Sequence, residues 1–200
     1  SAISTQPLPS HQGVSMPLSQ LDKHPALIVI DLQKGIVRLP LAHPSHEVIG
    51  KAALLAKAFR ARGFPVVLVN VAGGAPGRTD VSHRFDPPAD WADLIPELDQ
   101  QPGDHTVTKT RWGAFHNTDL DAHLKSLNVS QVFLCGIATS IGVESTARHA
   151  HEHGYHVVLV TDAMTDLDPL AHQHSIDKIF PRLGESTATN DLLSLLKEKQ

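Results

Sequence analysis

The sequence has little of several features that mark particular classes of protein. It contains one cysteine, which excludes a framework of internal disulfides and suits a reducing compartment. No apolar run approaches the roughly 18 to 20 residues that cross a membrane. The formal net charge of -4 leaves no basic excess to bind a nucleic-acid backbone. We therefore expect a cytoplasmic protein that binds neither membranes nor nucleic acids.

Patterns for nucleotides and metals are also scarce. No Gly-x-Gly-x-x-Gly follows an expected strand and no Walker sequence occurs, so nucleotide binding has little support. The fourteen histidines include His149 and His153, a pair at i, i+4 that would bind zinc on a helix if a third ligand reached them. Because these histidines lie in polar stretches, we favour solvated surface residues over a metal site. We expect neither a metal nor another cofactor.

The composition that is present supports one compact domain. A hydrophobic content of 41% in 200 residues is enough for one sizeable core. We expect this domain to span residues 21–200. The preceding segment begins with fifteen residues that are rich in Ser, Pro and Gln and lack an apolar stretch. Residues 1–20 are therefore predicted to be a disordered arm or a remnant added for expression.

Apolar runs of strand length alternate with stretches of helical spacing. The first run, at 26–31, is continuously apolar up to its final acid, as is typical of a strand buried on both faces of a parallel sheet. The alternation predicts an α/β fold with helices on both faces of the sheet. The expected strands are 26–31, 64–69, 105–108, 132–135, 156–160 and 184–188. The expected helices are 48–62, 91–98, 119–127, 169–180 and 191–197.

The segment from Gln131 to Ala147 joins an expected strand to an expected helix. Gly136 permits a sharp exit from the strand. Thr139 or Ser140 can cap the helix, with Glu144 placed to return the bond. The first turn of this helix would point free N–H groups and a positive dipole end into a crevice above the sheet.

Two charged residues end other expected strands. Asp31 follows the first strand, and open α/β sheets bind ligands at the carboxyl ends of their strands. From position alone, a capping or turn aspartate is an equal alternative. Lys109 ends the third strand. In the irregular segment 70–88, Arg84 can clamp a carboxylate, although a single loop arginine is more often solvated.

Three strings resemble motifs of the isochorismatase-like hydrolases, a family within the cysteine hydrolase superfamily. Residues 31–33 read D-L-Q and resemble the family's D-x-Q. Residues 109–115 read K-T-R-W-G-A-F and resemble K-x-R-[YW]-[SG]-A-F, in the form found in isochorismatases. Residues 136–143 resemble G-[VI]-x-T-x-x-C-V. The resemblance covers about residues 24–192 and implies a Rossmann-like three-layer αβα sandwich with a six-stranded parallel sheet.

The resemblance also implies the site. It places a catalytic triad at Asp31, Lys109 and Gly142, where Gly142 occupies the position of the family's nucleophilic cysteine. It further implies a cis peptide between Ile137 and Ala138 that directs a backbone N–H at the substrate. The substrate-binding residues expected on the same basis are Gln33, Arg84, Trp112, Phe115, Ile137, Ala138 and Thr139.

Glycine at position 142 changes the expected chemistry. It has no thiol, which excludes amide hydrolysis through a thioester at this position. Isochorismatases, as the resemblance implies, also have glycine here and cleave a vinyl ether without a covalent intermediate. Asp31 would protonate the enolpyruvyl methylene carbon, and water would capture the resulting cation to release pyruvate. The expected substrate is a small-molecule carboxylate such as isochorismate.

Some alternatives remain open on the sequence. A catalytically silent protein of this fold that binds small carboxylates is possible, although the retention of both Asp31 and Lys109 argues against it. We expect Cys135 to be a buried, unreactive residue of its strand. We also expect a homo-oligomer.

Overall fold

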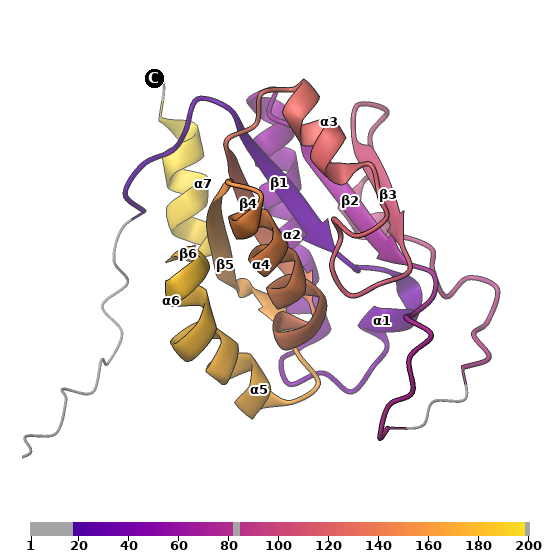
Figure 1. Ribbon diagram of the computed structural model, residues 1–200. Coiled ribbons are helices and arrows are strands. Elements are labelled where there is room, and N and C mark those ends of the chain that lie inside the picture. Colours follow the sequence, from indigo (N-terminus) through magenta and orange to yellow (C-terminus); the bar gives the residue numbers. More distant parts are fainter. Residues whose placement is uncertain (1–17, 82–84, 199–200) are drawn as a thin grey trace, which may run out of the picture.

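The computed structural model describes residues 18–81 and 85–198, and in them six strands form one parallel sheet (Figure 1). The strand order is β3-β2-β1-β4-β5-β6, and all neighbouring strands run in parallel. The strands are β1 (Pro25–Ile30), β2 (Val66–Val71), β3 (His105–Lys109), β4 (Gln131–Ile137), β5 (His156–Thr165) and β6 (Gly184–Thr187). The predicted α/β fold with a six-stranded parallel sheet is confirmed.

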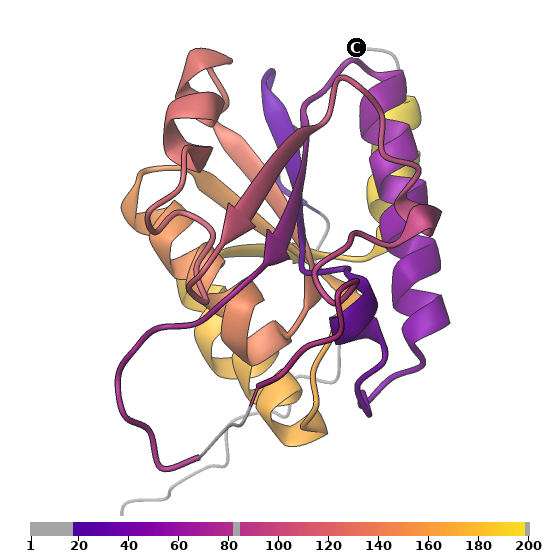
Figure 2. The same cartoon turned by 90° about the vertical axis from the view of Figure 1, so that its right-hand side faces the viewer.

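Helices cover both faces of the sheet. Figure 2 shows α2 and α7 on one face, and α3, α4, α5 and α6 on the other. The α-helices are α1 (Lys34–Val37), α2 (Ser45–Ala61), α3 (Leu120–Ser126), α4 (Glu144–Glu152), α5 (Pro169–His174), α6 (Phe180–Leu183) and α7 (Thr189–Lys197). The described residues also form one 3-10 helix, η1 (Pro96–Leu98), and two π-helical turns, η2 (Thr139–Val143) and η3 (Ser175–Ile179). Across the described residues, no helix is long and apolar enough to cross a membrane.

The central strand β1 explains why its sequence is continuously apolar. All six of its residues are buried. Leu27 and Val29 pack in the core beneath α2 and α7, whereas Ile28 and Ile30 pack in the core on the opposite face. A strand with both faces covered has no solvent-facing position, so the sequence shows no alternation.

Gly136 is required by the sheet rather than by an exit from it. The strand was expected to end at Cys135, but β4 continues to Ile137. Gly136 has a φ of 121°, and a Cβ atom there would lie 2.0 Å from the carbonyl oxygen of Ile30. Only glycine lets β4 pass this close to β1 in that conformation.

Three other expected elements differ from the structure. The strand expected at 156–160 extends to Thr165, after a register shift in its pairing with β4. The helix expected at 169–180 is interrupted by the π-helical turn η3. The helix expected at 91–98 is reduced to η1, which has a proline at its start. The sequence did not predict the continuation of β5 because Thr161 and Asp162 are polar and resemble the end of a strand.

The domain contacts begin before residue 21. Residues 18–20 were assigned to the arm, yet Ser19 donates hydrogen bonds from its N–H and hydroxyl to Glu185, at 2.9 and 2.8 Å. The carbonyl of Gln20 accepts a bond from the Gln131 side chain. These bonds fix the chain beside β4 and β6. Residues 1–17 of the predicted arm lie outside the described residues.

Candidate functional site

Asp31 and Lys109 meet at the carboxyl edge of the sheet. Asp31 follows β1 and Lys109 ends β3, so the lysine side chain reaches across the end of β2, which lies between them. Lys109 Nζ lies 2.9 Å from Asp31 Oδ2, and the two side chains are only 2% and 8% exposed. The predicted contact between these residues is confirmed.

The two oxygens of the Asp31 carboxyl group have different surroundings. Oδ2 accepts the hydrogen bond from Lys109, which also donates to the carbonyl of Arg111 at 3.0 Å. Oδ1 is buried and has no hydrogen-bond partner among the described residues. Burial raises the pKa of Asp31 to about 6, against the opposing effect of the Lys109 charge and hydrogen bond. The group can therefore exchange a proton near neutral pH.

Gly142 lies beside the same oxygen of this carboxyl group that Lys109 bonds. A Cβ atom at Gly142 would lie 3.5 Å from Asp31 Oδ2, 3.5 Å from the carbonyl oxygen of Trp112 and 3.1 Å from Ile30 Cγ2. A side chain at position 142 would therefore begin directly beside Asp31, between Ile30 and the backbone of Trp112. Asp31, Lys109 and Gly142 are brought together as expected, while their catalytic roles remain predictions.

Thr146 connects the Gly142 turn to the loop after β3. Its buried hydroxyl donates to the carbonyl of Gly142 at 2.7 Å and accepts from the backbone N–H of Ala114 at 3.1 Å. The loop that follows Lys109 is thereby held against α4. No local sequence pattern predicts this bridge, because its ends are 32 residues apart.

The turn between β4 and η2 contains the expected cis peptide between Ile137 and Ala138. Within the described parts of the chain, the backbone N–H groups of Ala138 and Thr139 have no hydrogen-bond acceptor. Ala138 is partly exposed, so its N–H group is available to a bound molecule, whereas Thr139 is fully buried. Ile137, Ala138 and Thr139 lie in the same turn as expected, and their contact with substrate remains a prediction.

The predicted capping of the helix is wrong. The side chains of Thr139 and Ser140 do not cap the N-terminus of the helix. The Glu144 carboxylate accepts hydrogen bonds from Arg148 and Ser175 instead. The backbone N–H and the hydroxyl of Ser140 both donate to Asp166 Oδ2, at 2.8 and 2.7 Å. A carboxylate from the loop after β5 therefore occupies the capping position that the sequence assigned locally.

Asp166 is one of two residues near the turn that the sequence analysis missed. Burial tends to raise its pKa, but hydrogen bonds from Ser140 and nearby backbone groups lower it below the usual value. The second is His172 of α5, whose Nδ1 lies 2.6 Å from the hydroxyl oxygen of Thr139. Its ring contacts that of His43, with centroids 4.7 Å apart. Asp166 follows the last residue of β5, a position that would have marked it as a candidate. The sequence did not single it out because it predicted that this strand ends at residue 160.

The remaining substrate-binding candidates lie in different environments. Gln33 is fully buried. Its amide nitrogen donates to the carbonyls of Val71 and Trp91, and its amide oxygen accepts from the backbone N–H of Val71. Phe115 is 8% exposed and packs in the core, whereas Trp112 is 63% exposed. Arg84 lies outside the described residues. Contact of these residues with substrate remains a prediction.

The thiol of Cys135 is a poor nucleophile. Cys135 lies within β4, is fully buried, and packs in the core beneath α2. Burial raises the pKa of the thiol to about 12, so the thiolate is scarce at neutral pH. The predicted burial of Cys135 is confirmed.

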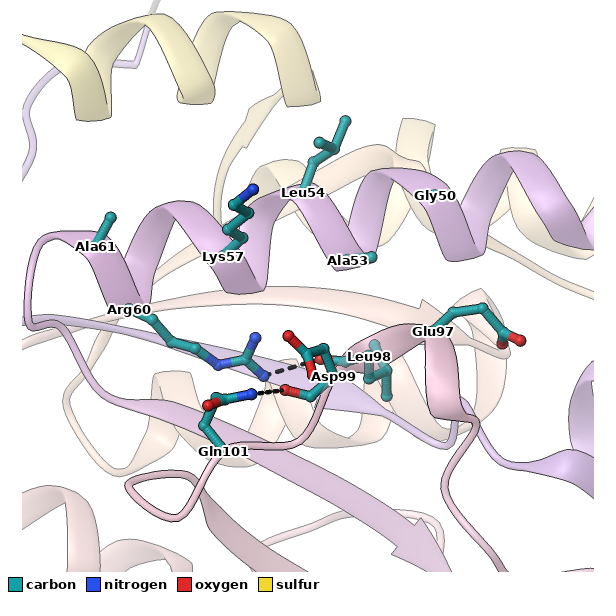
Figure 3. A pocket seen from close by; sticks show the side chains of 10 residues that line it. All are labelled: Gly50, Ala53, Leu54, Lys57, Arg60, Ala61, Glu97, Leu98, Asp99 and Gln101. Carbon is teal, nitrogen blue, oxygen red and sulfur yellow. Dashed lines mark hydrogen bonds between the residues drawn. The ribbon is translucent and has the colours of Figure 1, made fainter.

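A separate hollow of about 590 Å³ lies between α2 and the segment around η1 (Figure 3). Arg60 spans it with a hydrogen bond to the carbonyl of Leu98 at 3.0 Å and pairs with Asp104 at 2.7 Å. None of its lining residues belongs to the Asp31 site.

Within residues 18–81 and 85–198, no cluster of three His, Cys, Asp or Glu side chains is placed to hold a metal ion.

Comparisons with known proteins agree with this fold. The isochorismatase domain model matches residues 25–191. An uncharacterized isochorismatase family protein of Bacillus subtilis, YwoC, is 43% identical over 86% of this chain and 94% of its own. The solved structure of an isochorismatase family protein from Burkholderia thailandensis is 41% identical, with a TM-score of 0.86 over 92% of this chain and all of its own.

One of the more distant relatives is named for a specific activity. The ureidoacrylate amidohydrolase RutB of Variovorax paradoxus is 29% identical over 78% of this chain and 75% of its own. The family match extends over most of the chain, including all three positions at the carboxyl edge of the sheet. The chain belongs to the isochorismatase family of hydrolases.

Proposed function

We propose that this hydrolase cleaves a vinyl ether of a small carboxylic acid, such as isochorismate, and releases pyruvate without a covalent intermediate. The observation that carries the proposal is the Asp31 carboxyl group. One of its oxygens is buried and has no partner in the described part of the chain, its pKa is raised to about 6, and Gly142 places no side chain beside it. A carboxylic acid in these surroundings is suited to donate a proton to a substrate bound against it.

The reaction begins with proton transfer from Asp31 to the terminal methylene carbon of the enolpyruvyl group. The double bond supplies the electron pair for the new C–H bond, and an oxocarbenium ion forms at the neighbouring carbon. Water adds to that carbon and loses a proton, which gives a hemiketal. The hemiketal breaks its ether C–O bond, so pyruvate and the ring alcohol leave, and solvent returns a proton to Asp31.

Lys109 and the turn assist at different points of this reaction. The Lys109 ammonium, 2.9 Å from Asp31 Oδ2, stabilises the carboxylate that remains after the proton has been donated. The free N–H group of Ala138, which is partly exposed, is suited to hold a substrate carboxylate or carbonyl oxygen. Gly142 provides room for the substrate where a side chain would contact Asp31.

Amide hydrolysis is the second candidate function, and the similarity to RutB favours it. Position 142 offers no thiol, so water would have to attack the amide carbonyl directly. Asp31 would then act as a base and would need to be ionised. Activity by this route rises as the pH increases through about 6, whereas the vinyl ether route falls.

The pH dependence allows one experiment to separate the functions. Purified protein is incubated from pH 5 to pH 8 with isochorismate, and pyruvate is measured with lactate dehydrogenase. Parallel samples receive ureidoacrylate, and amide cleavage is followed as loss of substrate. Pyruvate release that depends on Asp31 and declines above about pH 6 supports the proposal.

Two results would redirect the assignment. Cleavage of the amide alone, with the opposite pH dependence, would replace the proposal by the second candidate. Binding of isochorismate without any turnover, measured by calorimetry, would instead support the catalytically silent carboxylate-binding protein. The Asp31→Asn protein serves as the matched control in each assay.

A further inference from the structure

The turn that carries the free N–H group of Ala138 is hydrogen-bonded to a buried histidine, His172. Thr139 is completely buried, and its hydroxyl has one hydrogen-bond partner among the described residues, His172 Nδ1 at 2.6 Å. His172 lies on α5, which begins after the end of β5, and is 7% exposed. The bond therefore joins the start of η2 to an element 33 residues further along the chain.

A second bond fixes the same turn from the same direction. Ser140, the next residue, donates twice to Asp166 in the loop that leads into α5. Asp166 is itself anchored, because its carbonyl accepts from Ala42 and its Oδ1 accepts from the backbone of Asp168. Two consecutive residues of the turn, Thr139 and Ser140, are therefore hydrogen-bonded to the segment 166–172.

The surroundings of His172 keep its ring in place. His43 contacts it at a centroid distance of 4.7 Å, and His43 Nδ1 lies 2.7 Å from the hydroxyl of Thr165, the last residue of β5. Burial and the neighbouring His43 lower the pKa of His172, against the opposing effect of Asp166. The lowered pKa favours the neutral imidazole, whose Nδ1 can accept a hydrogen bond from the Thr139 hydroxyl.

We propose that His172 is a positioning residue of the substrate site, which acts through the Thr139 hydroxyl to hold the backbone N–H group of Ala138 toward the substrate. It does not touch the reacting atoms. This inference rests on the proposal that the turn binds the substrate. Errors of about 1 Å in such a group can cost roughly 100-fold in rate, so a buried residue behind it can control turnover.

The test compares variants that remove the bond from either end. His172→Phe keeps a ring against His43 and removes Nδ1, and Thr139→Val keeps the shape of the side chain and removes the hydroxyl. Thr139→Ser and His172→Asn retain a hydroxyl or an acceptor at the same place and serve as conservative variants. His174→Phe is the matched control, since His174 is an exposed residue of the same helix.

Hydrogen exchange followed by NMR gives a readout that does not depend on any substrate. We expect His172→Phe and Thr139→Val each to speed exchange of the Ser140 amide by about five- to tenfold, relative to the amides of β4. The double variant should exchange no faster than either single variant. A loss of global stability alone would instead speed exchange throughout β4.

Kinetics with isochorismate complete the test. Both single variants should lower kcat/KM by roughly tenfold or more, the double variant should be no worse, and the two conservative variants should retain most of the activity. Multiplying effects in the double variant, or a His172→Phe protein that matches the His174→Phe control in exchange and kinetics, would overturn the inference. If wild-type protein releases no pyruvate, the proposed function fails, and the exchange data still decide whether His172 positions the turn.

Discussion

Lys109 Nζ donates a hydrogen bond to one oxygen of Asp31 at 2.9 Å, and the other oxygen of that carboxyl group is buried without a partner among residues 18–81 and 85–198. This asymmetry distinguishes the pair from an ion pair that only stabilises the fold, in which both oxygens would be satisfied. A buried acceptor without a partner costs free energy, about 1 to 3 kcal/mol in typical proteins. Its retention at the carboxyl edge of the sheet is consistent with a group kept ready for substrate.

The first prediction concerns this carboxyl group. Asp31→Asn preserves the shape of the side chain and removes the transferable proton. Turnover of isochorismate should fall by roughly 10²- to 10⁴-fold with little change in KM. Steady-state pyruvate release measures both constants. An Asp31→Asn protein with unimpaired turnover would eliminate the proposed acid.

The second prediction concerns the pH profile. Asp31 must be protonated to act as an acid, and its pKa is about 6, so kcat/KM should be constant at lower pH and decline above that value. Lys109 lowers this pKa by its charge and hydrogen bond. Lys109→Met removes the cation and keeps the length of the side chain, so the decline should move to higher pH while KM for a carboxylate substrate rises. A profile that moves to lower pH in Lys109→Met would contradict the proposed electrostatic effect.

Much of the fold follows from patterns that short segments carry by themselves. The strand at β1 was predictable because both of its faces are covered, which leaves a continuous apolar run. The end of β5 was not, because Thr161 and Asp162 look like a turn although the strand resumes through Ala163 and Met164. Its continuation depends on pairing with Gly136 and Ile137 after a register shift, which no local pattern encodes.

The site divides in the same way. Asp31, Lys109 and Gly142 were predictable because each lies in a motif of a few neighbouring residues. Asp166 and His172 were not, because their partners in the turn lie 26 and 33 residues away. The local alternative, a capping box from Thr139 or Ser140 to Glu144, is common in isolated helices, and tertiary contacts replaced it here.

The third prediction connects Asp31 to stability. An acid whose pKa is raised in the folded protein contributes stability that is full below its unfolded pKa and is lost as pH rises through the folded pKa. For Asp31 these values are about 3.8 and about 6. The free energy of unfolding of the wild type, relative to Asp31→Asn, should therefore decline between these pH values and level off above them. Urea unfolding of both proteins at half-unit steps of pH measures this difference, and a constant difference would contradict the raised pKa.

The fourth prediction concerns the single thiol. Cys135 is fully buried and the pKa of its thiol is raised to about 12, so alkylation of the native protein by iodoacetamide should proceed only as fast as the protein opens. Protein unfolded in urea should react at the rate of an ordinary thiol. Mass spectrometry follows both reactions. Rapid labelling of native protein with loss of activity would identify Cys135 as a displaced nucleophile.

The fifth prediction concerns the space at Gly142. In Gly142→Ala the added methyl group would lie 3.1 Å from Ile30 Cγ2 and 3.5 Å from Asp31 Oδ2, so Ile30 must shift by a few tenths of an ångström. Alanine is favoured over glycine within a helix by about 0.5 to 1 kcal/mol, which offsets the tight contact. The free energy of unfolding should therefore change by less than about 1 kcal/mol.

Activity should respond differently from stability in the same variant. The methyl group occupies the space beside the proton donor, so kcat/KM for isochorismate should fall by about tenfold or more. Gly142→Cys should lower it further and should not create an efficient amidase. Gly50→Ala in α2 is the matched control, since no atom lies within 4 Å of its added methyl group, and it should retain full activity. Unchanged pyruvate release by Gly142→Ala would show that the substrate does not use this space.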